Sequence, residues 1–213
     1  HVTQRGNRRQ KVFFSEKDFD HYRQLLAESC RHCETACWAY CLMPNHVHLV
    51  LAPGHPNGLR AALAEAHRRY TRHVNDREGW RGHLWQERFH SFPMDEEHLL
   101  AAVRYVERNP VKAGLTRAAA DWPWSSATAH LRGVDDRLVT VQPMLERVRD
   151  WVAYLSGGED PTVVERLRKH SRTGRPAGSQ GFLEVAEKIS GRSLRPRKCG
   201  RRSRRGEHGT CTK

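Results

Sequence analysis

Two histidines one residue apart, His46 and His48, open an apolar stretch that reads HVHLVLA. Side chains alternate between the two faces of a β-strand, so both imidazoles would leave one face while Val47 and Leu49 turn to the other. Their backbones would lie about 7 Å apart, a spacing at which two imidazoles can bind one divalent metal ion. The alternative is a pair of surface histidines on a half-buried strand, so the pair needs further ligands.

A second candidate lies in the stretch RYVERNPV, which carries Tyr105 and Asn109. Residues four apart share one face of a helix. A phenol can attack phosphorus and hold the product as a phosphotyrosine, and an amide oxygen can be a third ligand for Mg²⁺ or Mn²⁺. The alternative is a half-buried tyrosine of an amphipathic helix and an asparagine that suits the turn before Pro110.

Aromatic and basic residues alternate between residues 80 and 90, with Trp85, Gln86 and Arg88 at the centre. Single-stranded nucleic acid is commonly held by exposed aromatic rings next to arginine. Core packing explains Phe89 and one tryptophan equally well. A run of cysteines, from Cys30 to Cys41, invites a zinc interpretation, but it crosses from a helical into an extended pattern, so buried thiols are expected instead.

The charge is concentrated at the end of the chain. The 213 residues carry a formal net charge of +13, and residues 161–213 hold 15 Lys or Arg against 4 Asp or Glu. Such a segment suits a polyanion such as nucleic acid, which we expect it to hold through phosphates, with autoinhibition as the competing view. Apolar runs are too short to span a bilayer, and no signal peptide is expected, so the protein is predicted to be cytoplasmic.

The elements that must position these residues follow from hydrophobic periodicity. The pattern predicts strands at residues 2–7, 35–43, 46–52 and 85–92. It predicts helices beginning after Ser15, over 59–74, and from Asp95 to Pro110. This order predicts an α+β fold, a ferredoxin-like antiparallel sheet with helices on one face plus one more helix. Further helices are expected at 141–155, 161–170 and 180–190, with a domain over 1–155 and a basic extension over 156–213, disordered after about 192.

Several motifs together resemble one family. They are QRGN at residues 4–7, WAYCLMPNHVHLV at 38–50, LWQERF at 84–89 and RYVERNPVKAGL at 104–115. In this order they resemble the REP-associated tyrosine transposases, bacterial relatives of the single-strand insertion-sequence transposases within the HUH nuclease superfamily. WPWSS at 122–126 and TGRPAGS at 173–179 extend the likeness over roughly residues 2–200.

The resemblance implies a metal-dependent endonuclease and strand transferase that acts on single-stranded, REP-type hairpin DNA through a 5′-phosphotyrosine. It implies Tyr105 as the nucleophile, and His46, His48 and Asn109 as ligands for Mg²⁺ or Mn²⁺. A nucleoid-associated monomer is favoured over a homodimer. The alternatives are a non-catalytic hairpin-binding regulator and a nickase like the replication initiators and relaxases. The expected DNA contacts are Arg5, Asn7, Arg68, Arg69, Arg72, Trp85, Gln86, Arg88, Arg172, Arg175, Arg197 and Lys198.

Overall fold

A four-stranded antiparallel sheet lies at the centre of the computed structural model, which describes residues 1–158 and 160–195. The strand order is β2-β3-β1-β4. β3 therefore separates β1 from β2, as in the split βαβ arrangement of ferredoxin-like folds. The predicted α+β class and antiparallel sheet are confirmed. The strands are β1 (Val2–Arg5), β2 (Thr35–Met43), β3 (His46–Pro53) and β4 (His90–Ser91).

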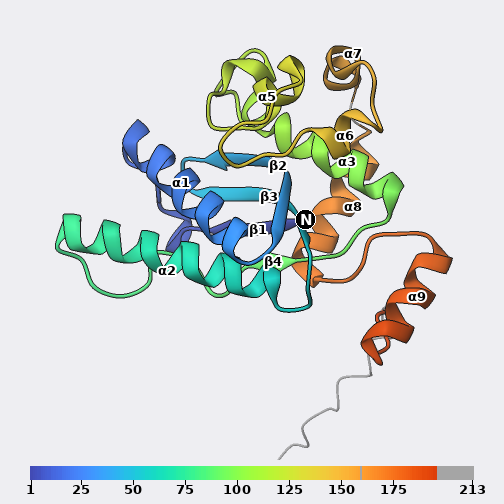
Figure 1. Cartoon of the computed structure of the whole chain (residues 1–213), viewed down its shortest axis with the longest axis horizontal. Helices are drawn as coiled ribbons and strands as arrows, with labels where there is room; N and C mark the ends of the chain where they lie inside the picture. The colour runs from blue at the N-terminus through green and yellow to red at the C-terminus, as the bar shows by residue number, and fades with distance from the viewer. Residues whose placement is uncertain (159, 196–213) are drawn as a thin grey trace, which may run out of the picture.

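Helices α1 (Glu16–His32) and α2 (Gly58–Glu78) cover one face of the sheet (Figure 1). α1 begins after Ser15 as predicted, because the Asp18 carboxylate accepts the backbone N–H of Ser15 at 2.9 Å. The buried side chains of both helices pack on Val47 and Leu49 of β3. These two strand residues point away from the histidines, as the alternating pattern predicted.

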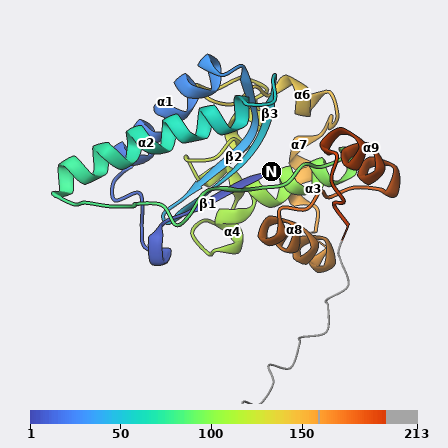
Figure 2. The same ribbon diagram turned by 90° about the horizontal axis from the view of Figure 1, so that it is seen from below.

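The two helices of the ferredoxin-like core cover one face as predicted, whereas the face taken by the additional helix was not predicted. α3 (Glu96–Glu107) packs on the opposite face, so the sheet lies between two helical layers, which Figure 2 shows. The physical reason lies in β2 and β3, which carry apolar residues on both faces. Ala39 and Val50 join α3 in a second buried cluster. A β-bulge between Cys37 and Ala39 shifts which residues of β2 face each layer.

Helix α3 starts at the cap residue Asp95, whose carboxylate accepts the backbone N–H of His98 at 3.1 Å. It ends before Pro110 as predicted, and a short helix α4 (Asn109–Lys112) follows at once. Pro110 lies in the first turn of α4, where its missing N–H costs no helical hydrogen bond. Arg108 keeps helical dihedrals between the two helices, so Tyr105 and Asn109 remain one turn apart.

The strand predicted over 85–92 is only two residues long. Glu87 has φ +54°, a left-handed conformation that interrupts the extended chain. At this interruption the carbonyls of Gln86 and Glu87 accept hydrogen bonds from a side chain. The amide nitrogen of the buried Gln4 donates to them at 3.0 and 3.2 Å. This irregular segment places Gln86 beside the end of β1, where its N–H donates to the carbonyl of Arg5 at 2.8 Å.

The prediction of a single helix over residues 141–155 is wrong. Two short helices form there, because Asp150 leaves the helical conformation and caps the second one by accepting the N–H of Ala153 at 2.8 Å. The short helices that complete this part of the molecule are η1 (Asn7–Arg9), η2 (Ala119–Asp121), α5 (Ala127–Arg132), α6 (Gln142–Leu145) and α7 (Trp151–Ser156).

Two helices predicted in the basic extension form close to their expected bounds, as α8 (Pro161–Thr173) and α9 (Gln180–Ser190). α8 lies against β4 and α3, and α9 lies farther from the sheet (Figures 1 and 2). The domain boundary at 155/156 stays a prediction. The disorder expected after about 192 concerns residues that, from 196 on, lie outside the described ones. None of the described helices has the length and hydropathy needed to cross a membrane.

Candidate active site

One cavity of about 610 Å³ brings together the four expected catalytic and metal-binding residues and some of the expected DNA contacts. Its floor comes from β1 and β3, and its walls come from α3, the start of α4 and α8. It brings together seven predicted residues: Arg5, His46, His48, Gln86, Tyr105, Asn109 and Arg172. It also includes eight residues that were not predicted: His1, Thr3, Gln4, His90, Glu165, Leu167, Arg168 and Ser171.

The two histidines leave the same face of β3, with ring centroids 4.9 Å apart and ring planes nearly perpendicular. Nδ1 of His46 lies 2.6 Å from the side-chain oxygen of Asn45. An amide oxygen only accepts, so Nδ1 carries the proton and Nε2 keeps its lone pair. This contact prepares His46 to act as a ligand through Nε2.

Burial keeps both imidazoles neutral at pH 7. Desolvation, with a smaller effect of the Arg5 charge, lowers the pKa of His46 to about 4. The pKa of His48 is held well below its usual value, first by desolvation and then by the charges of His46 and Arg5. Only a neutral imidazole can donate a lone pair to a metal, so the site is ready for a cation without first losing a proton.

Tyr105 faces the histidines from α3. Its ring centroid lies 5.5 Å from that of His48, with the two planes nearly perpendicular. The Lys112 ammonium lies 4.8 Å from the centroid of the same tyrosine ring, which places a positive charge beside the phenol. Asn109, only 9% exposed, lines the cavity one turn further along the chain. The tyrosine, the amide and the two imidazoles therefore converge on one space.

His1 is part of this site, although nothing in the sequence pattern indicated it. Its ring stacks on that of His48 at 5.3 Å, and its Nε2 lies 3.2 Å from Nδ1 of His48. The register between β1 and β3 brings the two rings together. Thr3 of β1 pairs with His48 of β3, and His1 lies two residues before Thr3. Cross-strand register is a tertiary property, so spacing along the chain gave no signal for it.

The side chains present fit a hard divalent cation held by two imidazoles and one amide oxygen. Within residues 1–158 and 160–195, no three His, Cys, Asp or Glu side chains are arranged so that they could hold a metal ion. The expected ligand set, two neutral imidazoles and one amide, carries no charge. The cysteines form no such set, since Cys37 and Cys41 of β2 point into different core clusters on opposite faces of the sheet.

The basic face of α2 lies outside this cavity. Arg68, Arg69 and Arg72 border a separate hollow of about 350 Å³ beside α1. Each arginine has an acidic partner, namely Glu65 at 2.8 Å, Glu28 at 2.9 Å and Asp76 at 3.6 Å, respectively. These pairs reduce the local positive charge that the sequence pattern indicated, so the hollow is a weaker candidate for phosphate contacts than the cavity.

Trp85 does not offer a stacking surface. It is 7% exposed and belongs to the core, where its ring lies 4.7 Å from that of His67 and 5.8 Å from that of Tyr22. The core-packing alternative therefore holds for this tryptophan. Asn7 and Arg88 are exposed outside the cavity, and Arg175 is half-buried in the turn between α8 and α9. Arg197 and Lys198 lie outside the described residues.

The histidine pair lies on a central strand of a ferredoxin-like sheet and faces a tyrosine on α3, as the resemblance to the HUH nucleases led us to expect. Comparison with known proteins supports the family resemblance that the sequence motifs indicated. The sequence pattern of the family described as "Transposase IS200 like" matches residues 1–109, just over half of the chain. The chain therefore belongs to the IS200-like transposase family.

Two relatives carry names that refer to REP elements. A protein of Haemophilus influenzae, described as a REP-associated tyrosine transposase, is 28% identical over 116 residues, which are 49% of this chain and 66% of that protein. The chain thus spans slightly less than two thirds of that relative's length. A solved structure, described as the REP-associated tyrosine transposase bound to a REP hairpin, matches with a TM-score of 0.52 and 21% identity, covering 65% of this chain and 82% of that one. This structural likeness supports the fold.

Proposed function

We propose that the protein is a metal-dependent endonuclease and strand transferase for single-stranded DNA, which cleaves and rejoins REP-type hairpins through a 5′-phosphotyrosine. The observation that carries the proposal is the convergence of Tyr105, Asn109 and the neutral pair His46 and His48 on one cavity. The names of the two relatives favour REP hairpin DNA as the substrate.

The chemistry assigned to Tyr105 is a transesterification. Its phenolic oxygen forms a bond to the scissile phosphorus, and the bond from phosphorus to the 3′-oxygen breaks. The phenolic proton is lost and the leaving oxygen gains one, so a free 3′-OH and a 5′-phosphotyrosine result. The reverse attack by a 3′-OH rejoins the strand, and no ATP is needed, because the phosphotyrosine conserves the energy of the phosphodiester.

The remaining residues orient the reaction. A Mg²⁺ or Mn²⁺ ion bound by His46, His48 and Asn109 would act as a Lewis acid on the scissile phosphate. Asn45 fixes the ring of His46, and Lys112 places positive charge beside the tyrosine ring. Because Tyr105 and His48 of one chain already face each other, we propose that Tyr105 serves its own chain's site in a monomer.

The decisive test is incubation of the protein with a labelled single-stranded REP hairpin and Mn²⁺, followed by denaturing electrophoresis. We expect a DNA-linked protein band with the wild type and none with Tyr105→Phe, because phenylalanine lacks the attacking oxygen. Tyr105→Phe should still bind the hairpin in a gel shift.

A matched control is Tyr154→Phe, which removes another tyrosine hydroxyl outside the cavity, one that donates to the carbonyl of Leu100. This variant should keep the covalent band. A band that survives Tyr105→Phe would refute the assignment of the nucleophile. Binding of the hairpin without any covalent band in the wild type would favour the non-catalytic alternative.

A further inference from the structure

Helix α8 forms one wall of the cavity, although it begins more than fifty residues after Asn109 in the sequence. Glu165, Arg168 and Arg172 line the cavity from this wall. Their spacing of three and four residues places them on one face of the helix. Two guanidinium groups therefore border the same space as the histidine pair and Tyr105.

The wall is fixed to the sheet. Leu167 of α8 is 2% exposed and packs in a cluster with Phe92 and Ala102. The hydroxyl of Ser171 lies 3.0 Å from that of Thr3, which pairs with His48 across the sheet. The backbone that carries Arg168 and Arg172 is thus tied to the strand that lies beside the histidines.

Both arginines share one acidic partner. A guanidinium nitrogen of Arg172 lies 3.6 Å from the carboxylate of Glu165, and one of Arg168 lies 4.0 Å away. Among the lining residues in the described part of the chain, Glu165 carries the only carboxylate, whereas Arg5, Arg168 and Arg172 carry positive charges. The two ion pairs are long and solvent-exposed, and such pairs are weak and easily exchanged.

From these contacts we infer that Arg168 and Arg172 bind a phosphodiester group of the single strand that enters the cavity, and that Glu165 is the internal anion which this phosphate displaces. Guanidinium groups match phosphate oxygens in charge and in fork geometry. The inference rests on the proposed function and deepens it, since it assigns the strand's backbone contact to α8. In this assignment Arg168 and Arg172 bind the backbone of the strand and hold it in the cavity.

The test measures binding of a fluorescent single-stranded oligonucleotide, taken from the foot of a REP hairpin, across a range of salt concentrations. All variants are made in the Tyr105→Phe background, so that binding is observed without reaction. Arg168→Gln with Arg172→Gln should weaken binding at least about tenfold and reduce the slope of log affinity against log salt by about 0.7, since both arginines bind one phosphate and each neutralised phosphate of a single strand contributes about 0.7. Glu165→Gln should strengthen binding several-fold.

The matched control is Arg166→Gln, which removes the same charge from a residue of α8 that does not line the cavity. It should weaken binding less than the single variant Arg168→Gln. Equal losses for the two single variants would overturn the site, because they would show a general charge effect. Unchanged binding in the double variant, or weaker binding in Glu165→Gln, would overturn it as well.

A second readout separates this inference from the proposed function. In chains that keep Tyr105, the arginine variants should form the covalent band with a raised KM for DNA and a nearly unchanged kcat. An unchanged KM would refute the role of α8 while the nuclease assignment stands. A wild-type chain that forms no covalent band, but loses binding in the arginine variants, would refute the nuclease and leave the phosphate site in place.

Discussion

At the scale of single residues, His46 and His48 differ from surface histidines in their burial. Both stay neutral far below the usual pKa of imidazole, so protons compete weakly with a metal ion for them. We predict that His46→Ala with His48→Ala lowers the rate at which the Mn²⁺-dependent covalent band forms by more than about a hundredfold, since losing only a hydrogen-bond partner of a metal ligand already costs about 10- to 100-fold. Cleavage that still responds to Mn²⁺ in this variant would count against the metal site.

His67, in the contact between α1 and α2, makes the fold sensitive to acid. The Nε2 of His67 lies 2.9 Å from the Tyr22 hydroxyl, and desolvation lowers the pKa of His67 to about 3. The unfolded chain takes up a proton near the ordinary imidazole pKa of about 6.5, whereas the folded chain does not. The free energy of unfolding should therefore fall as the pH drops from about 6.5 towards 3, by at most about 1.4 kcal/mol per pH unit for this proton.

Urea unfolding at about pH 7.5 and about pH 5 checks this expectation. His67→Gln keeps a polar partner for Tyr22 but cannot take up the proton. The variant should lose less stability than the wild type between the two pH values. An equal loss in both proteins would mean that the acid sensitivity arises at other groups, such as His46 and His48.

The sequence predicted the histidine pair, the tyrosine and the asparagine of the cavity because these residues lie close together on regular elements. Alternation along one strand set the faces of His46 and His48, and helical spacing joined Tyr105 to Asn109. The contributions of His1 and Arg168 were missed, because each reaches the cavity through tertiary packing between distant segments. Trp85 was misassigned because an aromatic residue among arginines looks the same in a core and on a nucleic-acid surface.

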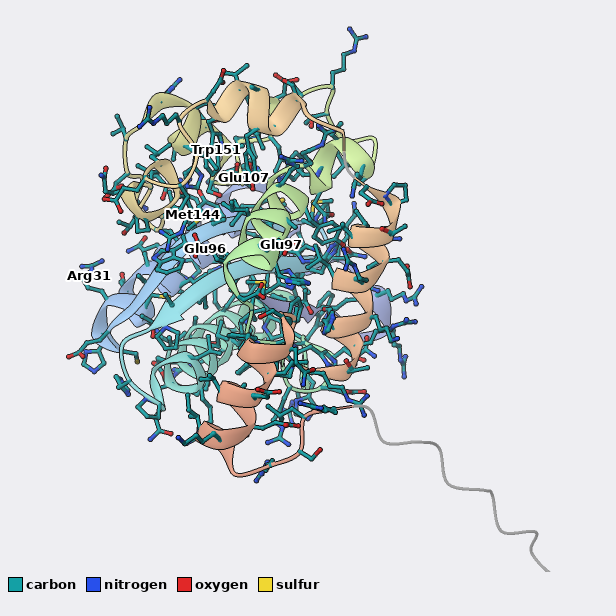
Figure 3. All side chains as sticks on the ribbon, turned by 90° about the vertical axis from the view of Figure 1, so that its right-hand side faces the viewer. Arg31, Glu96, Glu97, Glu107, Met144 and Trp151 are labelled. Atoms are coloured by element: carbon teal, nitrogen blue, oxygen red, sulfur yellow. The ribbon has the colours of Figure 1, made fainter. Side chains whose placement is uncertain are left out.

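At the scale of elements, the end of α3 is anchored by a buried carboxylate. Glu107, fully buried, accepts hydrogen bonds from Ser126 at 2.5 Å, His130 at 2.6 Å and Trp151 at 3.0 Å. Figure 3 shows Glu107 and Trp151 close together. These donors come from α7, from α5 and from the residue that caps α5, so one side chain joins two helices to the helix that carries Tyr105.

We predict that Glu107→Ala lowers the free energy of unfolding by about 3 kcal/mol, because three buried donors lose their acceptor. Glu96→Ala is the control on the same helix. Glu96 pairs with Arg147 at 2.5 Å, but its side chain is 62% exposed, so its loss should cost less than about 1 kcal/mol. Chemical denaturation of both variants checks the difference. Equal losses would contradict the anchoring role of Glu107.

The order of elements was predictable from periodicity, whereas their faces and some lengths were not. The α3 helix covers the second face because β2 is apolar on both sides, which a half-buried strand pattern does not reveal in the presence of a bulge. The strand at 85–92 was overestimated because the side chain of Gln4 satisfies backbone carbonyls there. The helix over 141–155 breaks because Asp150 forms a new cap.

At the scale of the whole molecule, the basic extension contains the arginines of α8 and the basic residues of positions 196–213. Residues 196–213 carry seven Lys or Arg and one Glu. We predict that a chain ending at Arg195 still forms the covalent band but binds hairpin DNA more weakly and with a flatter salt dependence. A chain ending at Leu155 should also lose thermal stability, because it exposes Phe92 and Ala102 where Leu167 covers them.

Binding curves at several salt concentrations and a thermal melt of both shortened chains test these predictions. Unchanged affinity and salt slope in the chain ending at Arg195 would refute a DNA-binding role for the last segment. A higher cleavage rate in that chain would instead support the autoinhibitory view. An unchanged melting temperature in the chain ending at Leu155 would contradict the packing of α8 on the body.

The position of α8 in the sequence also determines when it is synthesised relative to the rest of the cavity. Asn109 and Arg172 are separated by 63 residues, so at synthesis rates of 5–20 residues per second a ribosome needs about 3 to 13 seconds to pass from one to the other. During that interval a growing chain already contains the sheet, the histidines and the tyrosine, but lacks the cationic wall. The phosphate contact that we propose for α8 is therefore completed only after the proposed catalytic residues have been synthesised.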